Sequence, residues 1–198
     1  MTKRIGTLAL IASLATPCWA ADRPAPHRKG GAKSYAVYGE YARDANKLMK
    51  GMNNRRIFNV VEAQEGDDIK LNADGSITLA PGTYRINGFS LVTMQTTFAP
   101  PEAKNNTNYP GYAVVYPKAY ESSSDLLKHL VAYGSPQPAL DGVPSFFDLI
   151  YTAEEKTDLC VGHQSGKDLH DEVYLSVYEV DGIKSDTHLF ARVAITKM

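Results

Sequence analysis

The polar stretch between His163 and Glu172 holds the residue types best suited to chemistry in this chain. It carries two imidazoles and three carboxylates, the ligand types that bind zinc and related divalent metals. His163, His170, Asp171 and Glu172 are therefore candidate metal ligands, and the matching function is a metal-assisted hydrolase. Their spacing matches no standard metal site, and a polar hairpin loop is rich in such residues for turn formation alone. A solvated or ligand-contacting loop is the other interpretation.

Tyrosines gather around two long polar segments, residues 95–111 and 117–128. Exposed tyrosine beside asparagine and serine is typical of an adaptable binding surface, but tyrosine is equally an ordinary strand residue. Both interpretations stay open for this group. The candidate ligand-binding residues are Tyr109, Tyr112, Tyr120, His163 and Gln164.

Motifs of known catalytic sites do not occur in the sequence. A Gly-x-Ser-x-Gly turn, a phosphate-binding glycine loop, a His-Glu-x-x-His pair and a Cys-x-x-Cys pair are all absent. The pair Asp67-Asp68 supplies too few oxygen ligands for calcium and is better explained as a turn. We therefore predict no catalytic residue, and no cofactor other than the divalent metal considered above.

The first twenty residues have the pattern of a cleaved secretory signal. Lys3 and Arg4 precede an apolar run, Ile5–Ala15, which at about eleven residues is too short to span a bilayer as a helix. Small residues follow it, as signal peptidase requires, and we expect cleavage after Ala20 or Ala21. The mature protein is then secreted or periplasmic and has no transmembrane segment.

Charge and cysteine content exclude several function classes. The 198 residues include 21 Lys and Arg against 22 Asp and Glu, so a nucleic-acid binder with a basic face is not expected. Signal cleavage removes Cys18 and leaves Cys160 as the single thiol, so no intramolecular disulfide can form. We expect Cys160 to be a small buried residue in a strand. An intermolecular bridge or a nucleophile is the alternative.

Two segments separate the signal from the main domain. Residues 21–34 are rich in Pro, Gly and basic residues without apolar periodicity, which predicts a flexible leader. Over residues 35–55 apolar side chains recur at spacings of three and four, which predicts one short amphipathic helix. The same residues fit a heptad for only two repeats, so a short oligomerising stalk is the alternative.

Residues 56–198 change to a period of two with Gly, Pro, Asp and Asn between the apolar runs. About ten short strands without alternating helices predict an all-β antiparallel sandwich or barrel. Asn87-Gly88 is expected to bend or bulge its strand, and one helical turn is expected around Ser124–Leu127. The predicted strands are Ile57–Ala63, Ile69–Leu71, Ile77–Leu79, Tyr84–Met94, Tyr112–Tyr116, His129–Tyr133, Ser145–Tyr151, Asp158–His163, Glu172–Val180 and His188–Thr196.

The run Gly75-Ser-Ile-Thr-Leu-Ala-Pro-Gly-Thr-Tyr-Arg-Ile86 resembles a strand, Pro-Gly turn and Tyr-containing strand of the tumour necrosis factor and complement globular-head superfamily. Gly134-Ser135, Ser145–Leu149 and Asp171–Val177 are similar to later strands of the same architecture, which bacterial and phage-fibre members share. The resemblance covers roughly residues 56 to 198 and rests on turn and strand chemistry.

The resemblance implies a jelly-roll sandwich in a compact homotrimer that binds proteins or carbohydrates and catalyses nothing. It places no family binding residue on this chain. The leading hypothesis is therefore an exported, non-enzymatic jelly-roll protein, homotrimeric, which contacts a protein or glycan partner through its long loops. The alternative is the metal-binding enzyme at the loop from His163 to Glu172.

Overall fold

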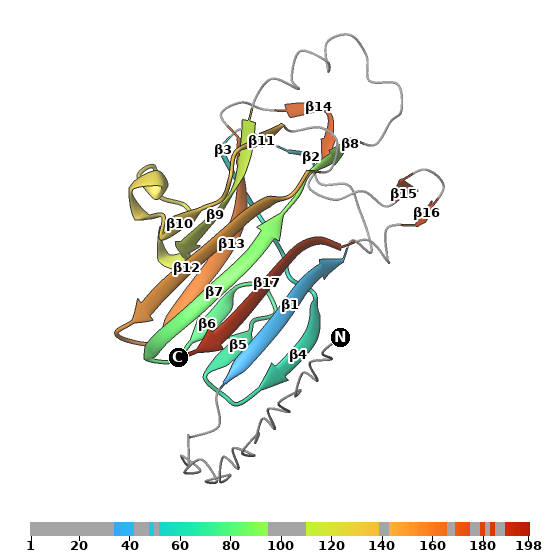
Figure 1. The fold of residues 1–198 in the computed structure, drawn as a ribbon. Coiled ribbons are helices and arrows are strands. Elements are labelled where there is room, and N and C mark those ends of the chain that lie inside the picture. Colours follow the sequence, from blue (N-terminus) through green and yellow to red (C-terminus); the bar gives the residue numbers. More distant parts are fainter. Residues whose placement is uncertain are drawn as a thin grey trace, which may run out of the picture. The chain divides into compact units, whose positions relative to one another are not determined.

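Two antiparallel sheets make up most of the computed structural model of the chain (Figure 1). The structure describes residues 34–41, 48–49, 52–94, 110–138, 143–165, 169–174, 179–180, 183–184 and 189–198. All of these belong to one unit, Gly31–Met198. The signal peptide and most of the predicted leader lie outside the described residues. None of the helices in the described part of the chain is long and apolar enough to cross a membrane.

The first sheet has five strands and joins the two ends of the domain. Its first and last strands along the chain are neighbours, with Ala36 opposite Ile195 and Tyr38 opposite Val193. Alternate side chains point into the sandwich, as in β7, where Tyr84 and Ile86 are buried. In spatial order the strands are β12 (Ser145–Ala153), β7 (Gly82–Ser90), β17 (Leu189–Lys197), β1 (Tyr35–Tyr41) and β4 (Val60–Glu65).

The second sheet has seven strands and packs behind the first. In spatial order its main path is β10 (Ala132–Tyr133), β9 (Pro110–Pro117), β13 (Thr157–Ser165), β6 (Ile77–Leu79) and β5 (Ile69–Leu71). Off this path, β11 (Gln137–Pro138) pairs with β9 and β3 (Met52–Arg55) pairs with β13. Because β12 and β13 follow each other in sequence but lie in different sheets, the chain crosses between the layers as a jelly roll requires.

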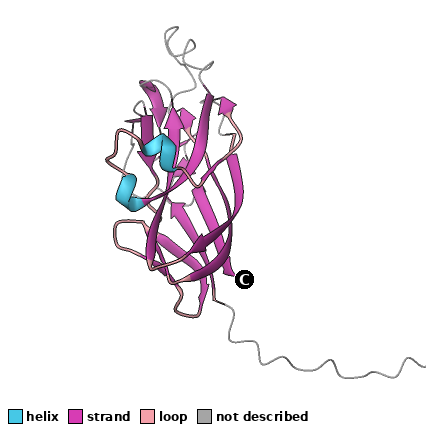
Figure 2. Ribbon diagram, turned by 90° about the vertical axis from the view of Figure 1, so that its left-hand side faces the viewer, coloured by secondary structure: helices cyan, strands magenta, loops and turns pink. Residues whose placement is uncertain are grey.

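Smaller elements complete the described structure. β2 (Leu48–Met49), β14 (Leu169–Tyr174) and β8 (Thr93–Met94) form a three-stranded sheet, and β15 (Glu179–Val180) pairs with β16 (Ile183–Lys184). Two short 3-10 helices, η1 (Lys118–Tyr120) and η2 (Leu126–His129), follow β9. Figure 2 shows both on the outside of the strands.

The main core lies between the sheets and a smaller one lies under η2. Tyr38, Ile86, Leu159 and Val193 belong to the main core and are at most 2% exposed. The small core contains Val114 and Tyr116 of β9, Cys160 of β13 and Leu126 of η2. Leu126 therefore covers the outer side of the second sheet. The prediction that Cys160 is a buried strand residue is confirmed.

The turn between β5 and β6 follows the sequence prediction. Gly75 has a φ of +79°, a left-handed conformation that favours glycine, and its N–H donates to the Asn72 carbonyl over 2.9 Å. The Asp74 carboxylate accepts hydrogen bonds from the backbone N–H and the hydroxyl of Ser76. The predicted strands on either side of this turn are confirmed at the predicted residues.

The predicted helix over residues 35–55 is wrong wherever the structure describes that segment. Residues 35–41 form β1, 48–49 form β2 and 52–55 form β3. Tyr38 and Tyr41 have helical spacing, but Ala36 and Tyr38 also alternate with more exposed neighbours, the period of a strand. Pairing on both sides, with β17 and β4, decides between the two patterns. The sandwich therefore begins at β1 rather than at residue 56.

Three further strand predictions need correction. The pairing of β7 with β12 and β17 runs through Asn87 and Gly88 without a register shift, so no bulge interrupts it. His129 lies in η2, and only Ala132–Tyr133 of its predicted strand is extended. The expected hairpin around residues 163–172 does not form, because β14 pairs with β2 and β8 and not with β13.

Candidate functional site

A network of buried polar side chains connects the two sheets at His163. Glu40 of β1 lies 3.5 Å from the Arg56 guanidinium, and Arg56 Nε donates to Ser90 Oγ over 2.7 Å. Ser90 Oγ lies 2.9 Å from His163 Nδ1. Because the serine hydroxyl already accepts from Arg56, its own proton is free for the imidazole nitrogen. All four side chains are buried.

The Ser90 and His163 pair is placed for structure rather than for catalysis. A serine beside an imidazole is the arrangement of a nucleophile with its base. Here both residues are at most 1% exposed, so a substrate has no access. Burial and the Arg56 charge lower the pKa of His163 to about 3, which makes its imidazole a weak base at neutral pH. The pair instead ties β7 of the first sheet to β13 of the second.

The candidate metal ligands are not brought together in the described part of the chain. His163 belongs to the buried polar network through its contact with Ser90. His170, Asp171 and Glu172 lie in β14, where only the backbone is described. Among the side chains that the structure describes, no group of three or more His, Cys, Asp or Glu residues is placed to hold a metal ion. No described contact therefore favours the metal-binding hypothesis.

The other candidate ligand-binding residues lie in different surroundings. Gln164 is buried in β13, and Tyr109 lies outside the described residues. Tyr112 lines a largely apolar groove of about 350 Å³ together with Tyr133. Tyr120 is partly exposed in η1 and stacks on His129, with ring centroids 3.6 Å apart and an interplanar angle of 3°.

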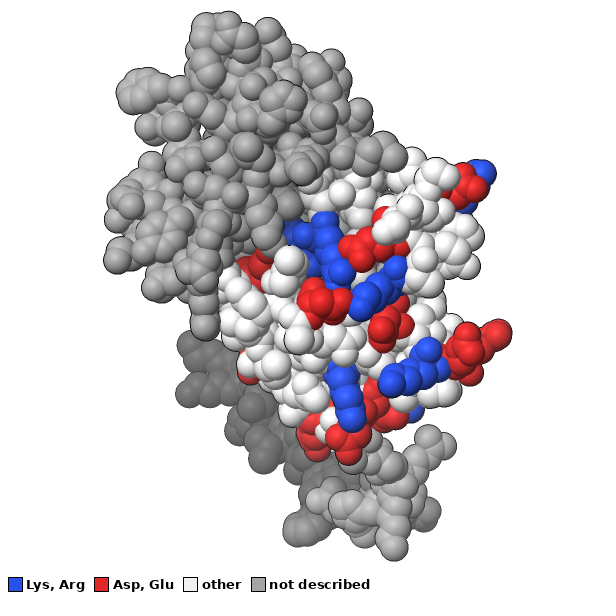
Figure 3. Space-filling model, turned by 180° about the vertical axis from the view of Figure 1, so that it is seen from behind, with Lys and Arg blue, Asp and Glu red and all other residues white. Residues whose placement is uncertain are grey.

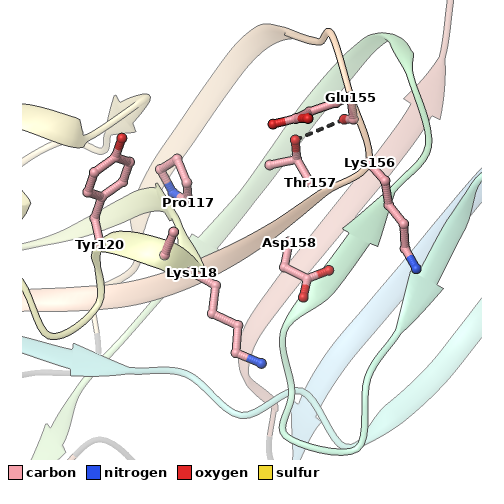
Figure 4. A pocket seen from close by; sticks show the side chains of 8 residues that line it. Pro117, Lys118, Tyr120, Glu155, Lys156, Thr157 and Asp158 are labelled. Carbon is pink, nitrogen blue, oxygen red and sulfur yellow. Dashed lines mark hydrogen bonds between the residues drawn. The ribbon is translucent and has the colours of Figure 1, made fainter.

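Tyr120 also borders a larger hollow with both polar and apolar walls, which we call the η1 hollow. It lies between η1 and the turn that joins β12 to β13, and its volume is about 740 Å³. Figure 4 shows Tyr120 and Pro117 on one side and Glu155, Thr157 and Lys156 on the other, with Asp158 and Lys118 below. The second long segment predicted from the sequence, residues 117–128, thus supplies one wall of a surface hollow.

The outward side of the five-stranded sheet, the front face, exposes large apolar side chains on β12. Phe146 and Ile150 of β12 are 59% and 67% exposed. Phe146 is paired in register with Phe89 of β7, and their rings meet edge to face at 5.9 Å. Beside them Arg85 pairs with Asp148 over 2.9 Å. Charges on this face are thus offset locally, and large apolar groups stay exposed.

Sequence reasoning missed the front face. The run Ser145–Ala153 contains aromatic or aliphatic residues on both of its faces, so its pattern does not reveal which side meets water. The structure turns Phe147 inward and Phe146 and Ile150 outward. An edge strand that is apolar on both faces is the signal that could have indicated a covered surface.

The outward side of the seven-stranded sheet has a different character. Arg55 pairs with Asp74 and Glu121, and Lys118 pairs with the same Asp74 over 2.5 Å. Lys118, and then Ser76, hold the pKa of the Asp74 carboxyl well below its usual range. Figure 3 looks at this side and shows lysine and arginine side chains beside aspartate and glutamate. Both outward sides of the sandwich therefore carry ion pairs, and the front face also exposes Phe146 and Ile150.

Comparisons with known proteins give a match in fold alone. No family model matches the sequence, and no curated protein sequence is significantly similar to it. Solved structures that resemble the chain include murine APRIL crystallised at pH 5.0, 8.5 and 8.0, with 9%, 6% and 6% sequence identity and TM-scores of 0.47, 0.48 and 0.45. Each match covers 84% of this chain and 98% or 99% of the other.

These values carry over no residue role and no partner. The matched protein, APRIL, is a jelly roll of the tumour necrosis factor family. The bacterial or phage-fibre type stays a prediction. The described part of the chain is an all-β, antiparallel, two-sheet sandwich.

Proposed function

We propose that this chain is an exported, non-enzymatic binding module that works as a homotrimer. The front face is the observation that carries the proposal. Phe146 and Ile150 expose more than half of their surface, which costs free energy in water at roughly 25 cal/mol per Å² of apolar area. Covering them with a second copy of the chain removes this cost, and the Arg85–Asp148 pair leaves no excess charge to repel that copy.

The position of the apolar residues supports a ring of copies. Phe146 and Ile150 lie on β12, which is the edge strand of its sheet, whereas Tyr35 lies on β1 near the opposite edge and is 38% exposed. If the β12 edge of one copy meets the β1 region of the next, the contact joins two different surfaces. Such head-to-tail contacts close into a ring when the rotation between neighbouring copies is a whole fraction of a turn. Three copies is the number that the sequence resemblance implies.

Light scattering coupled to size exclusion tests the assembly. We expect a mass three times that of the mature chain at micromolar concentration, and monomers for Ile150→Glu. Leu127→Glu is the matched control, because Leu127 is 51% exposed on η2 and lies away from the front face. A monodisperse wild-type monomer would overturn the trimer, and a trimeric Ile150→Glu variant would overturn its placement on the front face.

Binding is assigned to the long loops, residues 95–111 and 117–128. The second segment supplies Tyr120 and part of the η1 hollow, and most of the first lies outside the described residues. A buried serine and imidazole without access, and the lack of catalytic motifs in the sequence, support a role in binding rather than catalysis. The partner is a protein or a glycan.

Export is proposed from the sequence of residues 1–20. Intact mass measurement of protein recovered from the periplasm or the medium tests it. We expect the mass of a chain that begins at Ala21 or Asp22, with Cys160 as its single cysteine. A full-length mass, or a chain that stays in the cytoplasm, would contradict export without affecting the trimer.

A further inference from the structure

The η1 hollow has the size and the wall chemistry of a ligand site. Its volume of about 740 Å³ falls within the range of small-molecule pockets, roughly 300 to 1,000 Å³. One wall is apolar and formed by the Pro117 and Tyr120 rings, and the opposite wall is polar and formed by Glu155 and Thr157, while the Lys156 ammonium points away from the two rings (Figure 4). A ligand for this space must itself have an apolar face and a polar edge.

The apolar wall is held in place before any ligand arrives. Tyr120 is 36% exposed, yet its ring lies flat against His129 of η2 at a centroid distance of 3.6 Å. This stacking restricts the tyrosine side chain, so little conformational entropy remains to be lost on binding. A fixed aromatic ring gives a platform for the C–H groups of a ring-shaped ligand.

The floor of the hollow is also fixed, because its charged groups are already paired. Lys118 Nζ lies 2.5 Å from Asp74, and Asp158 accepts a hydrogen bond from Thr78 Oγ1 over 2.5 Å. Glu155 and Lys156, by contrast, make no side-chain hydrogen bond or ion pair with any residue that the structure describes. Glu155, whose carboxylate faces the apolar wall, is therefore the uncommitted acceptor of the site.

The balance of charges narrows the ligand class. The lining holds two carboxylates and two ammonium groups, and Asp74 offsets the charge of Lys118. Glu155 and Asp158 would repel a phosphate or sulfate anion. Lys156 and Lys118 would repel a metal cation. A neutral ligand with hydroxyl groups meets no such repulsion, because hydroxyls both donate to carboxylates and accept from ammonium groups.

We propose that the η1 hollow binds a neutral saccharide, whose C–H face packs on Tyr120 and whose hydroxyls donate to the Glu155 carboxylate. The inference rests on the proposed function as a binding module and names the partner class of its second long loop. It assigns Tyr120 as the platform and Glu155 as the hydrogen-bonding group.

The test uses the full mature chain on an array of neutral, sialylated and sulfated glycans, followed by saturation-transfer NMR and titration with the strongest neutral oligosaccharide. We expect neutral glycans to bind, and Tyr120→Ala and Glu155→Ala each to weaken the affinity at least tenfold. Tyr133→Ala and Glu154→Ala are matched controls, because both residues are exposed and lie outside the hollow. They should bind as the wild type does.

The outcomes that would contradict the proposal distinguish the saccharide site from the trimer. Absence of neutral glycan binding on the array and by NMR at millimolar sugar overturns the saccharide site, as does binding confined to charged glycans. Unchanged affinity of Tyr120→Ala overturns the site as well. The same samples are measured by light scattering. A trimer without glycan binding overturns this inference alone, and a glycan-binding monomer overturns only the proposed assembly.

Discussion

His163 makes the folded chain sensitive to mild acid. Burial and Arg56 lower its folded-state pKa to about 3 from an ordinary value of 6.5. Below pH 6.5 the His163 ring therefore binds a proton in the unfolded chain but not in the folded chain. Its contribution to the stability of the fold is fully present above pH 6.5 and is lost as the pH drops toward 3. The limiting slope is about 1.4 kcal/mol per pH unit.

Urea unfolding followed by circular dichroism between pH 6.5 and 5 measures this slope. Asp68, Asp74 and Asp148 also have lowered pKa values, but those carboxylates act below their ordinary value of 3.8, outside this window. His163→Gln should flatten the profile. Because that variant could fold poorly, an NMR titration of the His163 ring gives an independent check. A ring that titrates above pH 5 in the folded protein would contradict the prediction.

Arg56 should stabilise the fold mainly through its ion pair with Glu40. Arg56→Met removes the guanidinium that lies 3.5 Å from the buried Glu40 carboxylate, and breaking such a pair costs about 3 to 5 kcal/mol. Adding Glu40→Gln removes the buried negative charge and should restore part of the lost stability, although Ser90 Oγ and the Leu91 carbonyl still lack the Arg56 donor. Equal stability of the single and double variants in urea would show that the lost Arg56–Glu40 pair is not the main cause of the destabilisation.

Single residues were predicted from sequence where their type alone decides their surroundings. A lone cysteine in an apolar strand is usually buried, and Cys160 is. The placement of His163 could not be predicted, because its partners Ser90 and Arg56 lie far away in sequence. The outward direction of Phe146 could not be predicted either, since Phe147 is equally apolar and only strand register separates them.

At the scale of elements, η2 should act as a cover over Cys160. Burial raises the pKa of this thiol to about 12, so the thiolate that reacts is scarce at pH 8. Leu126 packs on the same small core, and Leu126→Ala should destabilise the chain by about 2 to 5 kcal/mol. We expect labelling of Cys160 by a thiol reagent to be slow in the wild type and clearly faster in Leu126→Ala.

The neighbouring leucine gives the control for that experiment. Leu127 is 51% exposed on the same 3-10 helix, so Leu127→Ala should label at the wild-type rate. Rapid labelling of the wild type would show that η2 does not cover the thiol. Equal rates for the two alanine variants would show that the cover does not depend on Leu126.

Elements with strong turn chemistry were predicted well, and elements defined by pairing were not. β5 and β6 flank a turn whose Asp74 and Gly75 have specific roles, and both strands were found at the predicted residues. β1 was predicted as a helix because Tyr38 and Tyr41 satisfy a spacing of three. Its strand partners, β17 and β4, supply hydrogen bonds that local sequence does not contain.

At the scale of the whole molecule, the sequence predicts the number of layers better than their connections. Alternating apolar residues and frequent turns require two faces that bury each other, which is a sandwich. The order of strands depends on contacts such as Tyr35 with Thr196, near the two ends of the domain. Such distant pairings leave no local signal.

The front face should make the stability of the chain depend on its concentration. If folding is coupled to assembly of three copies, each tenfold rise in concentration stabilises a protomer by about 1 kcal/mol. For a chain of this size that raises Tm by roughly 2 to 4 °C. Calorimetry from 1 to 100 µM should show this rise for the wild type and for Leu127→Glu, and a constant Tm for Ile150→Glu. A constant Tm for all three proteins would show that the apolar front face is not covered by copies of the chain under these conditions.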